Sequence, residues 1–201
     1  MSTPNTQRSP LRKQRLALSA KHRKHSAFLA SRHLYKLHTL LPKNAKIGIY
    51  LDGFGELPTA PLLAFCQRYG YQAYLPIVHI GKPLTFAPVM THFNKTPLKK
   101  HRLGMYEPIT KPHISADKLD MIICPLVAID NFGNRMGMGG GFYDRTLATA
   151  PNVIKVGYAY DFQRVDKLAV NAWDQKMDLL ISEKGIYRFK NKRDNYATKQ
   201  L

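Results

Sequence analysis

Residues 121–148 read MIICPLVAIDNFGNRMGMGGGFYDRTLA, and the fold class follows from this stretch. It begins with a short apolar strand, Met121–Cys124, which ends at a proline. A turn around Gly133 and a cluster of glycines follow, and Phe142 then begins a helix that reaches Ala148. A buried strand that leads into a helix is the repeating unit of proteins with α/β layers.

The same alternation continues toward the N-terminus. A helix is expected from Thr59 to Tyr69, ended by Gly70. The strand before Pro76 should stop at that proline, and residues 91–112 should be irregular because prolines and basic residues are scattered through them. Apolar runs typical of buried strands occur at residues 46–51, 72–75 and 84–89.

Toward the C-terminus, a strand is expected at residues 153–158, followed by a hairpin of strands 178–181 and 186–189. The basic tail, 190–201, is expected to be frayed. These elements predict an α/β fold: a three-layer α/β/α, Rossmann-like sandwich with a mostly parallel sheet. Because 201 residues suffice for one domain, we expect a single domain, 1–201, with its α/β core at 46–189.

Basic helices precede this core, in residues 8–41. Leucines recur there at about helical spacing, and Ser19 is a suitable N-cap that divides the stretch into two helices. The whole chain has 31 Lys and Arg against 13 Asp and Glu, a net charge of +18, and its first acidic residue is Asp52. Such a field attracts nucleic acid, an acidic membrane surface, or small molecules with phosphate or carboxylate groups.

Composition excludes several classes of protein. The longest apolar run, Met121–Ile129, is far shorter than the about 20 residues of a membrane-spanning helix. The N-terminus has no apolar segment of the secretory type. Cys66 and Cys124 lie in apolar surroundings and should be buried, reduced thiols. None of the eight histidines belongs to a cluster with zinc spacing. We therefore expect a cytoplasmic protein without a membrane-spanning segment.

The glycine-rich loop from Arg135 to Arg145 indicates a phosphate site. Four of the residues 137–141 are glycine, so backbone N–H groups can converge on an anion without obstruction by side chains. The helix that starts at Phe142 adds the positive end of its dipole, and the two arginines can neutralise phosphate. Asp144 fits beside a phosphate if it holds a bridging metal ion. A tight turn alone would explain one glycine, but not four with these charges.

Three further acidic residues are candidates. Asp174 and Asp178 follow the only tryptophan, Trp173, and a second carboxylate for Mg²⁺ has few other sources in a chain with 13 acidic residues. Alternatively, both are solvated loop carboxylates, and Trp173 is a core residue. Glu56 follows the strand 46–51, where ligands bind in α/β sheets, or it complements the dipole of the next helix.

With these motifs, the chain resembles the 5-formyltetrahydrofolate cyclo-ligases, also called 5,10-methenyltetrahydrofolate synthetases. The loop RMGMGGGFYDR at 135–145 resembles the family's R-x-G-x-G-x-G-[YF]-Y-D signature. Phe142 stands where the family usually has Tyr, and Trp173 where His is common. Further similarities run in family order: the basic pair Arg8 and Arg12, ELPT at 56–59, YLP at 74–76, GMYEP at 104–108, and a closing segment, 157–183.

The resemblance implies an ATP- and Mg²⁺-dependent ring closure. 5-Formyltetrahydrofolate and ATP would become 5,10-methenyltetrahydrofolate, ADP and phosphate. Transfer of the γ-phosphoryl group would activate the formyl oxygen, N10 would attack the formyl carbon, and phosphate would depart, so the protein mainly positions its ligands and stabilises charge. We expect a monomer whose partners are these small molecules, with no specific nucleic acid and no membrane.

The resemblance also implies roles for individual residues. Catalytic roles fall to Arg135, Tyr143 and Asp144, and the Mg²⁺ ligands are Asp144 and Asp174. The carboxylate of Glu56 can accept hydrogen bonds from N–H groups of the pterin. The residues implied for ATP are Arg8, Arg12, Arg135, Met136, Gly137, Met138, Gly139, Gly140, Gly141, Phe142 and Tyr143. The residues implied for folate are Leu51, Glu56, Met138, Gly139, Gly140, Gly141 and Phe142.

Three other interpretations remain open at this point. A nucleic-acid-binding module would explain the charge of +18, but not the glycine loop with its aspartate. An ATP-dependent ligase or kinase could use the same loop on another substrate. An inactive scaffold would be expected to lack Asp144, Asp174 or Glu56, and all three are present.

Overall fold

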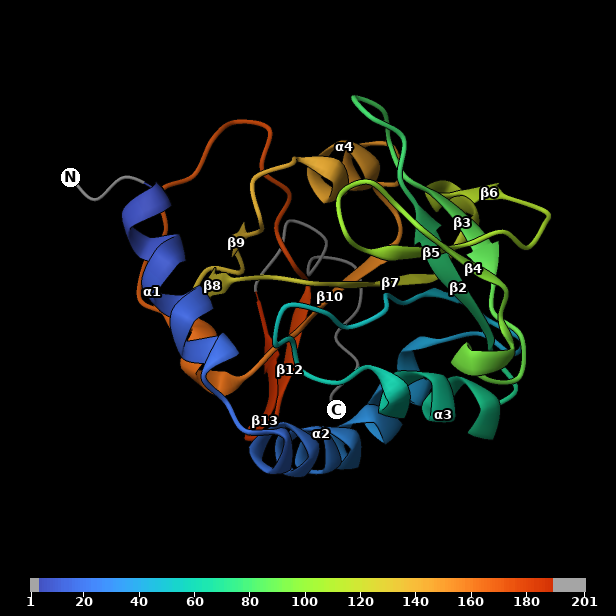
Figure 1. Cartoon of the computed structure of the whole chain (residues 1–201), viewed down its shortest axis with the longest axis horizontal. Coiled ribbons are helices and arrows are strands. Elements are labelled where there is room, and N and C mark those ends of the chain that lie inside the picture. The colour runs from blue at the N-terminus through green and yellow to red at the C-terminus, as the bar shows by residue number, and fades with distance from the viewer. Residues whose placement is uncertain (1–3, 190–201) are drawn as a thin grey trace.

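A twisted sheet forms the centre of the molecule in a computed structural model, which describes residues 4–189 (Figure 1). Its strands lie in the order β13-β12-β10-β7-β1-β2-β3-β6. The middle five, from β12 to β2, are parallel, and the outer ones pair antiparallel. The bounds are β1 (Lys46–Gly48), β2 (Gln72–Ile77), β3 (Thr85–Pro88), β6 (Ile114–Ser115), β7 (Met121–Cys124), β10 (Ile154–Tyr158), β12 (Leu179–Ser182) and β13 (Gly185–Arg188).

The direction of winding reverses between two neighbouring strands. The chain passes from β1 outward to β2 on one side, and then returns to β7 on the other side of β1 before it continues to β10 and β12. The register Ile47↔Met121 joins β1 to β7 at this reversal. The connections after β1 and β7 therefore leave in opposite directions, and in open α/β sheets a crevice forms at such a point, beyond the carboxyl ends of the strands.

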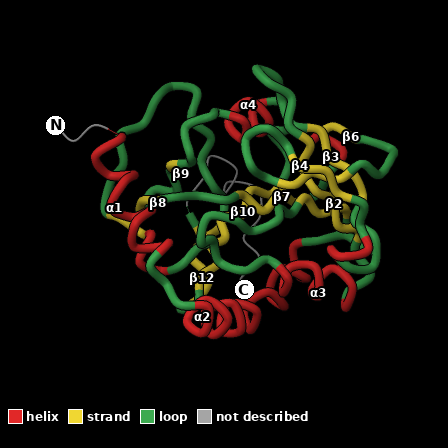
Figure 2. Tube along the Cα trace, viewed as in Figure 1, coloured by secondary structure: helices red, strands yellow, loops and turns green. Residues whose placement is uncertain are grey.

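Helices cover both faces of the sheet. Figure 2 shows α2 (Ala20–Leu34) and α3 (Ala60–Arg68) along one side of the strands, and α4 (Phe142–Ala148) on the opposite side. Successive side chains of a strand point to opposite faces, so Met121 and Ile123 pack with α2 and α3, whereas Ile122 packs in the core that contains Leu147 of α4. The predicted α/β class, with helices on both faces of a mainly parallel sheet, is confirmed.

The N-terminal helix α1 (Pro4–Leu16) lies beside a second, smaller sheet rather than on the large one (Figure 1). That sheet has the order β11-β8-β9. Leu11 of α1 packs against its buried cluster of Ala128, Met136 and Leu168. Ser19 Oγ accepts a hydrogen bond from the backbone N of His22 at 3.1 Å, which confirms Ser19 as the N-cap of α2. The bounds are β8 (Ala128–Asp130), β9 (Arg135–Met136) and β11 (Arg164–Val165).

Two expectations about residues 72–112 were wrong. β2 continues through Pro76 to Ile77, because its pairing with β1 ends at Tyr74 and a proline beyond that point removes no hydrogen bond to β1. Residues 91–112 are not irregular, because they contain the hairpin of β4 (Leu98–Lys100) and β5 (Tyr106–Pro108). Glu107 in β5 is 3% exposed and accepts a hydrogen bond from the backbone N of Val78 at 3.0 Å, a tertiary contact without a local sequence signal.

Most other elements agree with the sequence. β1 ends at Gly48, earlier than expected, although the backbone N of Ile49 still donates to Tyr74 at 2.8 Å. The terminal hairpin, β12 with β13, is confirmed, and Cys66 and Cys124 are buried free thiols.

No helix among residues 4–189 is long and apolar enough to span a membrane. The tail 190–201 lies outside the described residues. The short 3₁₀ helices are Tyr35–Leu40, Phe93–Lys95, Ala116–Lys118 and Asp161–Gln163.

Candidate active site

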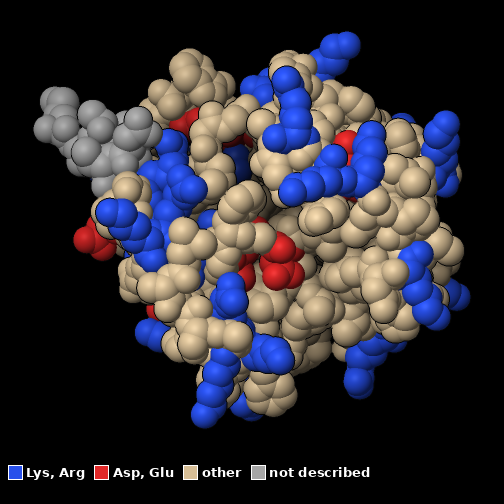
Figure 3. Space-filling view, viewed as in Figure 1, with Lys and Arg blue, Asp and Glu red and all other residues tan. Residues whose placement is uncertain are grey.

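A cavity of about 620 Å³ opens where the winding of the sheet reverses. Its walls come from the loops after β1 and β7, the glycine loop 137–141, the first turn of α4, and residues 169–174. Figure 3 shows Lys and Arg side chains spread over the surface around this region, while acidic side chains gather near the middle of the same face. One cavity thus brings together segments that lie far apart in the sequence.

Two glycines of the loop have backbone conformations that favour glycine. Gly139 has φ 100° and Gly141 has φ 64°, in the region that side-chain-bearing residues rarely adopt. Nε of Arg8 donates to the carbonyl of Gly137 at 3.0 Å, so α1 is hydrogen-bonded to the loop. Within the described chain, no hydrogen bond engages the backbone N–H groups of residues 137–141. The loop therefore retains free donors for an anion.

An ion pair links the two ends of the loop. Nη2 of Arg135 lies 2.7 Å from Oδ1 of Asp144, and the Arg135 side chain is 3% exposed. The same carboxylate oxygen accepts a long hydrogen bond, 3.4 Å, from the backbone N of Gln175. The guanidinium of Arg135 lies 5.7 Å from the ring centre of Tyr143. Arg145 does not line the cavity, because its Nη2 donates to the carbonyl of Gly140 at 2.8 Å.

The two acidic residues Asp174 and Asp178 have different surroundings. Asp174 lines the cavity, and its Oδ2 accepts a hydrogen bond from the backbone N of Asn171 at 2.7 Å. Asp178 does not line the cavity, because it accepts a hydrogen bond from the backbone N of Lys155 between β10 and β12. Trp173 is 68% exposed on the cavity wall, so the expectation of a core tryptophan was wrong. It lies within the tight turn that Asn171 and Asp174 close, and such a turn leaves it exposed.

Glu56 lies on the cavity wall beside Leu51, with its side chain 11% exposed. Its Oε2 accepts a hydrogen bond from the backbone N of Gly53 at 3.1 Å, and its Oε1 lies 3.8 Å from Nη1 of Arg15. Burial raises the pKa of Glu56 to about 7, against the opposing effects of Arg15 and the Gly53 N–H. The carboxyl group thus makes its contacts with α1 and its own loop rather than with the start of α3.

Of the residues implied for the site, all but Arg12 line this cavity. Arg12 lies outside the lining, and its buried Nε has no hydrogen-bond partner in the described chain. The implied residues that line the cavity are Arg8, Leu51, Glu56, Arg135, Met136, Gly137, Met138, Gly139, Gly140, Gly141, Phe142, Tyr143, Asp144 and Asp174.

Residues 2–183 match the 5-formyltetrahydrofolate cyclo-ligase family. The chain belongs to this family. The resemblance inferred from the motifs is confirmed, and the chain is an enzyme of the ligase class that acts in folate chemistry.

Curated cyclo-ligases and solved structures agree with this membership. The chain is 35% identical over 149 residues to the 5-formyltetrahydrofolate cyclo-ligase of Escherichia coli strain K12, with 71% of this chain and 80% of that relative covered. Identity to the Haemophilus influenzae cyclo-ligase is 34% over 182 residues, with 87% and 95% covered. The solved structure of Aquifex aeolicus 5,10-methenyltetrahydrofolate synthetase superposes with a TM-score of 0.76 at 29% identity, over 97% of each chain.

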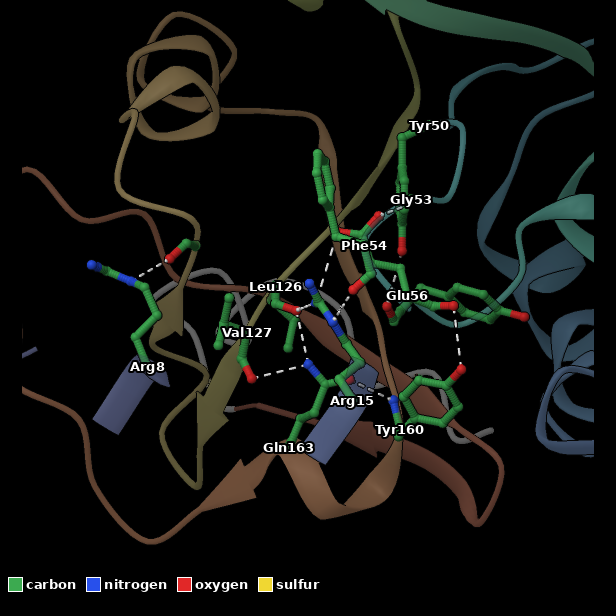
Figure 4. Close-up of polar contacts among 12 residues, drawn as sticks. Arg8, Arg15, Tyr50, Gly53, Phe54, Glu56, Leu126, Val127, Tyr160 and Gln163 are labelled. Atoms are coloured by element: carbon green, nitrogen blue, oxygen red, sulfur yellow. Dashed lines mark hydrogen bonds and ion pairs between the residues drawn. The ribbon is translucent and has the colours of Figure 1, made fainter. Parts of the chain in front are cut away.

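Sequence reasoning missed a buried arginine beside this site. Arg15 is 1% exposed and extends from α1 to the loops after β1 and β7 (Figure 4). Arg15 follows Arg8 by seven residues, with Arg12 between them, so all three arginines lie along one side of a helix. This spacing could have identified Arg15 from the sequence. The cavity wall also contains Tyr50, Asp52 and Tyr106, to which the sequence analysis assigned no ligand.

Proposed function

We propose that this chain closes the ring of 5-formyltetrahydrofolate to give 5,10-methenyltetrahydrofolate, with ATP and Mg²⁺. One observation carries the proposal: a loop of free backbone N–H donors and a buried carboxylate, Glu56, line the same cavity. The loop suits a polyphosphate, and the carboxylate suits the N–H groups of a pterin. Both ligands of a two-substrate reaction would therefore meet in one place.

For ATP, we assign the glycine loop, Arg8 and the start of α4. Arg8 lies 3.6 Å, measured from Nη1, from the position that a Cβ on Gly139 would occupy, so positive charge adjoins the loop. Arg12, the other basic residue implied by the family resemblance, lies outside the cavity lining. Its proposed contribution is to the positive field around the site rather than a contact with the nucleotide.

The carboxylates of Asp144 and Asp174 fit a magnesium ion that substrate phosphates share. Each has one oxygen, Oδ2 of Asp144 and Oδ1 of Asp174, without a hydrogen bond to the described residues. No group of three or more His, Cys, Asp or Glu residues in the described chain forms a closed metal site. Mg²⁺ is commonly held by one or two carboxylates together with phosphates and water, and when bound it neutralises phosphate charge.

The chemistry needs activation because a formamide oxygen is a poor leaving group. The γ-phosphoryl group moves to the formyl oxygen as its bond to ADP breaks. N10 then attacks the formyl carbon and loses its proton, and phosphate leaves with the formyl oxygen. Arg135, Tyr143 and Asp144 are the proposed catalytic residues, because they lie together where the loop enters α4 and can stabilise charge on the transferred group.

We also propose that the chain, residues 1–201, acts as one domain and as a monomer in the cytoplasm. A cavity lined by one chain, to which α1 contributes Arg8, supports the first two parts of this proposal. Two buried free cysteines support the third.

Isotope transfer tests the proposed chemistry. With ¹⁸O in the formyl group of the substrate, we expect the label to leave in phosphate and one ADP to form for each methenyl product. Omission of ATP or of Mg²⁺ should prevent product formation. Label released into water, or product formed without ADP, would contradict the phosphoryl activation.

A further inference from the structure

Arg15 connects three segments around the floor of the cavity without lining it. Its Nε donates to the carbonyl of Phe54 at 3.1 Å, and its Nη1 donates to the carbonyl of Leu126 at 3.1 Å. The same Nη1 lies 3.8 Å from Oε1 of Glu56. Figure 4 shows Arg15 between the loop that contains Phe54 and Glu56 and the loop that contains Leu126. Among the described residues, its carboxylate contact is thus with a residue of the cavity wall.

The backbone is shaped to let α1 approach this loop. Gly55 has φ 75°, and a Cβ at that position would lie 2.8 Å from the carbonyl oxygen of Arg15. Any larger residue would push the last turn of α1 away from Glu56. Gln163 holds the other side of the contact, because its Nε2 also donates to the carbonyl of Leu126, at 2.9 Å. The position of the guanidinium is therefore fixed from several sides.

The charged and titratable groups that act on Glu56 come from three elements. Asp52 and Tyr50 lie on its own loop, Tyr143 on α4, and Arg15 on α1. Asp52 raises the pKa of Glu56, as burial does, whereas Arg15 lowers it. Arg15 is the cation in this set. A neutral Glu56 would present an O–H donor where a pterin N–H needs an acceptor.

We propose that Arg15 is a positioning residue for the folate site, which favours the ionised form of the Glu56 carboxylate and holds it in place from behind the cavity wall. The inference rests on the proposed role of Glu56 in folate binding. It assigns to α1 a second task besides the contact of Arg8 with the glycine loop. Arg15 would act on folate binding and Arg8 on ATP binding, so the KM values of the two substrates can separate the two roles.

The test is the pH profile of kcat/KM for 5-formyltetrahydrofolate at saturating Mg-ATP, in Arg15→Gln and Arg15→Lys. Arg15→Gln removes the charge, so the acidic limb should move to higher pH. A displacement of one pH unit corresponds to an about tenfold increase in the folate KM on the acidic side of the limb. The activity should recover as the pH rises to about 9, while the KM for ATP stays unchanged. Arg15→Lys keeps a charge and should restore most of the wild-type profile.

Two controls separate this role from a structural one. Lys13→Gln removes one exposed charge from the same helix and should leave the profile unchanged. Thermal unfolding should show that each variant is folded. If Arg15→Gln lowers kcat/KM by the same factor at every pH, or if Arg15→Lys is no better than Arg15→Gln, the inference is overturned.

A double variant distinguishes this inference from the proposed function. If Arg15 acts through Glu56, then Arg15→Gln adds no further change in folate KM in a Glu56→Gln background. If Glu56→Gln raises the folate KM but Arg15→Gln adds an equal, independent loss, only the inference about Arg15 fails. If Glu56→Gln leaves the folate KM unchanged, the role of Glu56 fails, and the role of Arg15 fails with it.

Discussion

Asp144 and Arg135 form an ion pair of 2.7 Å across the glycine loop, from the first turn of α4 to strand β9. The Arg135 side chain is 3% exposed and that of Asp144 is 20% exposed, so the pair is only partly screened by water. It fixes the two ends of the loop relative to each other. Oδ2 of Asp144 stays free of hydrogen bonds to the described residues.

Asp144→Asn should abolish ring closure while the protein remains folded. The change keeps the size of the side chain but removes the charge that pairs with Arg135 and that we assign to Mg²⁺. Loss of one such electrostatic contact lowers kcat by about 100-fold or more. Methenyl formation from 5-formyltetrahydrofolate and Mg-ATP measures this loss, with Asp166→Asn, at an exposed position, as the matched control. Near-normal turnover of Asp144→Asn would remove Asp144 from the metal assignment.

Glu56→Gln should weaken folate binding more than ATP binding. The amide keeps the shape of the side chain but loses one acceptor oxygen and the charge. Hydrogen bonds to charged groups contribute about 1.5–3 kcal/mol, so the folate KM should increase roughly 10- to 100-fold. Steady-state KM values for both substrates provide the measurement. Equal effects on the two KM values would show that Glu56 is not part of the pterin site.

Glu56→Gln should also change how stability depends on pH. The pKa of Glu56 is raised by burial from 4.5 to about 7, so the folded chain releases this proton at a higher pH than the unfolded chain. Wild-type stability therefore falls as the pH rises from 4.5 to about 7, where the unfolded chain ionises and the folded chain does not. This pKa shift corresponds to a loss of about 3 kcal/mol in the free energy of unfolding. The Glu56→Gln variant should not show this loss. Urea unfolding of both proteins on either side of this window measures the effect; parallel pH dependences would contradict it.

Gly139→Ala should impair ATP use without loss of the fold. Gly139 has φ 100°, a conformation in which a residue with a side chain is strained by roughly 1–3 kcal/mol. The loop would move to relieve that strain, and its N–H donors would lose alignment. We expect a higher KM for ATP and a smaller effect on the folate KM. Gly185→Ala is the control, because a Cβ there meets nothing within 4 Å. An unchanged KM for ATP would contradict the role of the loop.

The parts of the fold that local patterns determine could be predicted. The apolar run of β7 and the glycines before α4 indicated a strand, a loop and a helix, and the α/β class followed. The hairpin of β4 and β5 could not be predicted, because Glu107 binds the backbone of Val78, 29 residues away. Pro76 continues a strand because the pairing with β1 has already ended.

The candidate site likewise contains residues that could be predicted from the sequence and residues that could not. Residues of the glycine loop could be named from sequence because they are consecutive. Arg15 could not, because the carbonyls that it binds belong to Phe54 and Leu126, 39 and 111 residues away. Trp173 was expected in the core from its residue type, and its exposure follows from a tight turn that residue type does not encode.

A single assay can test ATP-dependent ring closure by this chain. The purified protein is incubated with 5-formyltetrahydrofolate and Mg-ATP, and the absorbance of the methenyl product is followed together with ADP. Methenyl product and ADP should appear in equal amounts, and neither should form when either substrate is omitted. If folded protein forms neither methenyl product nor ADP, ATP-dependent ring closure by this chain is contradicted.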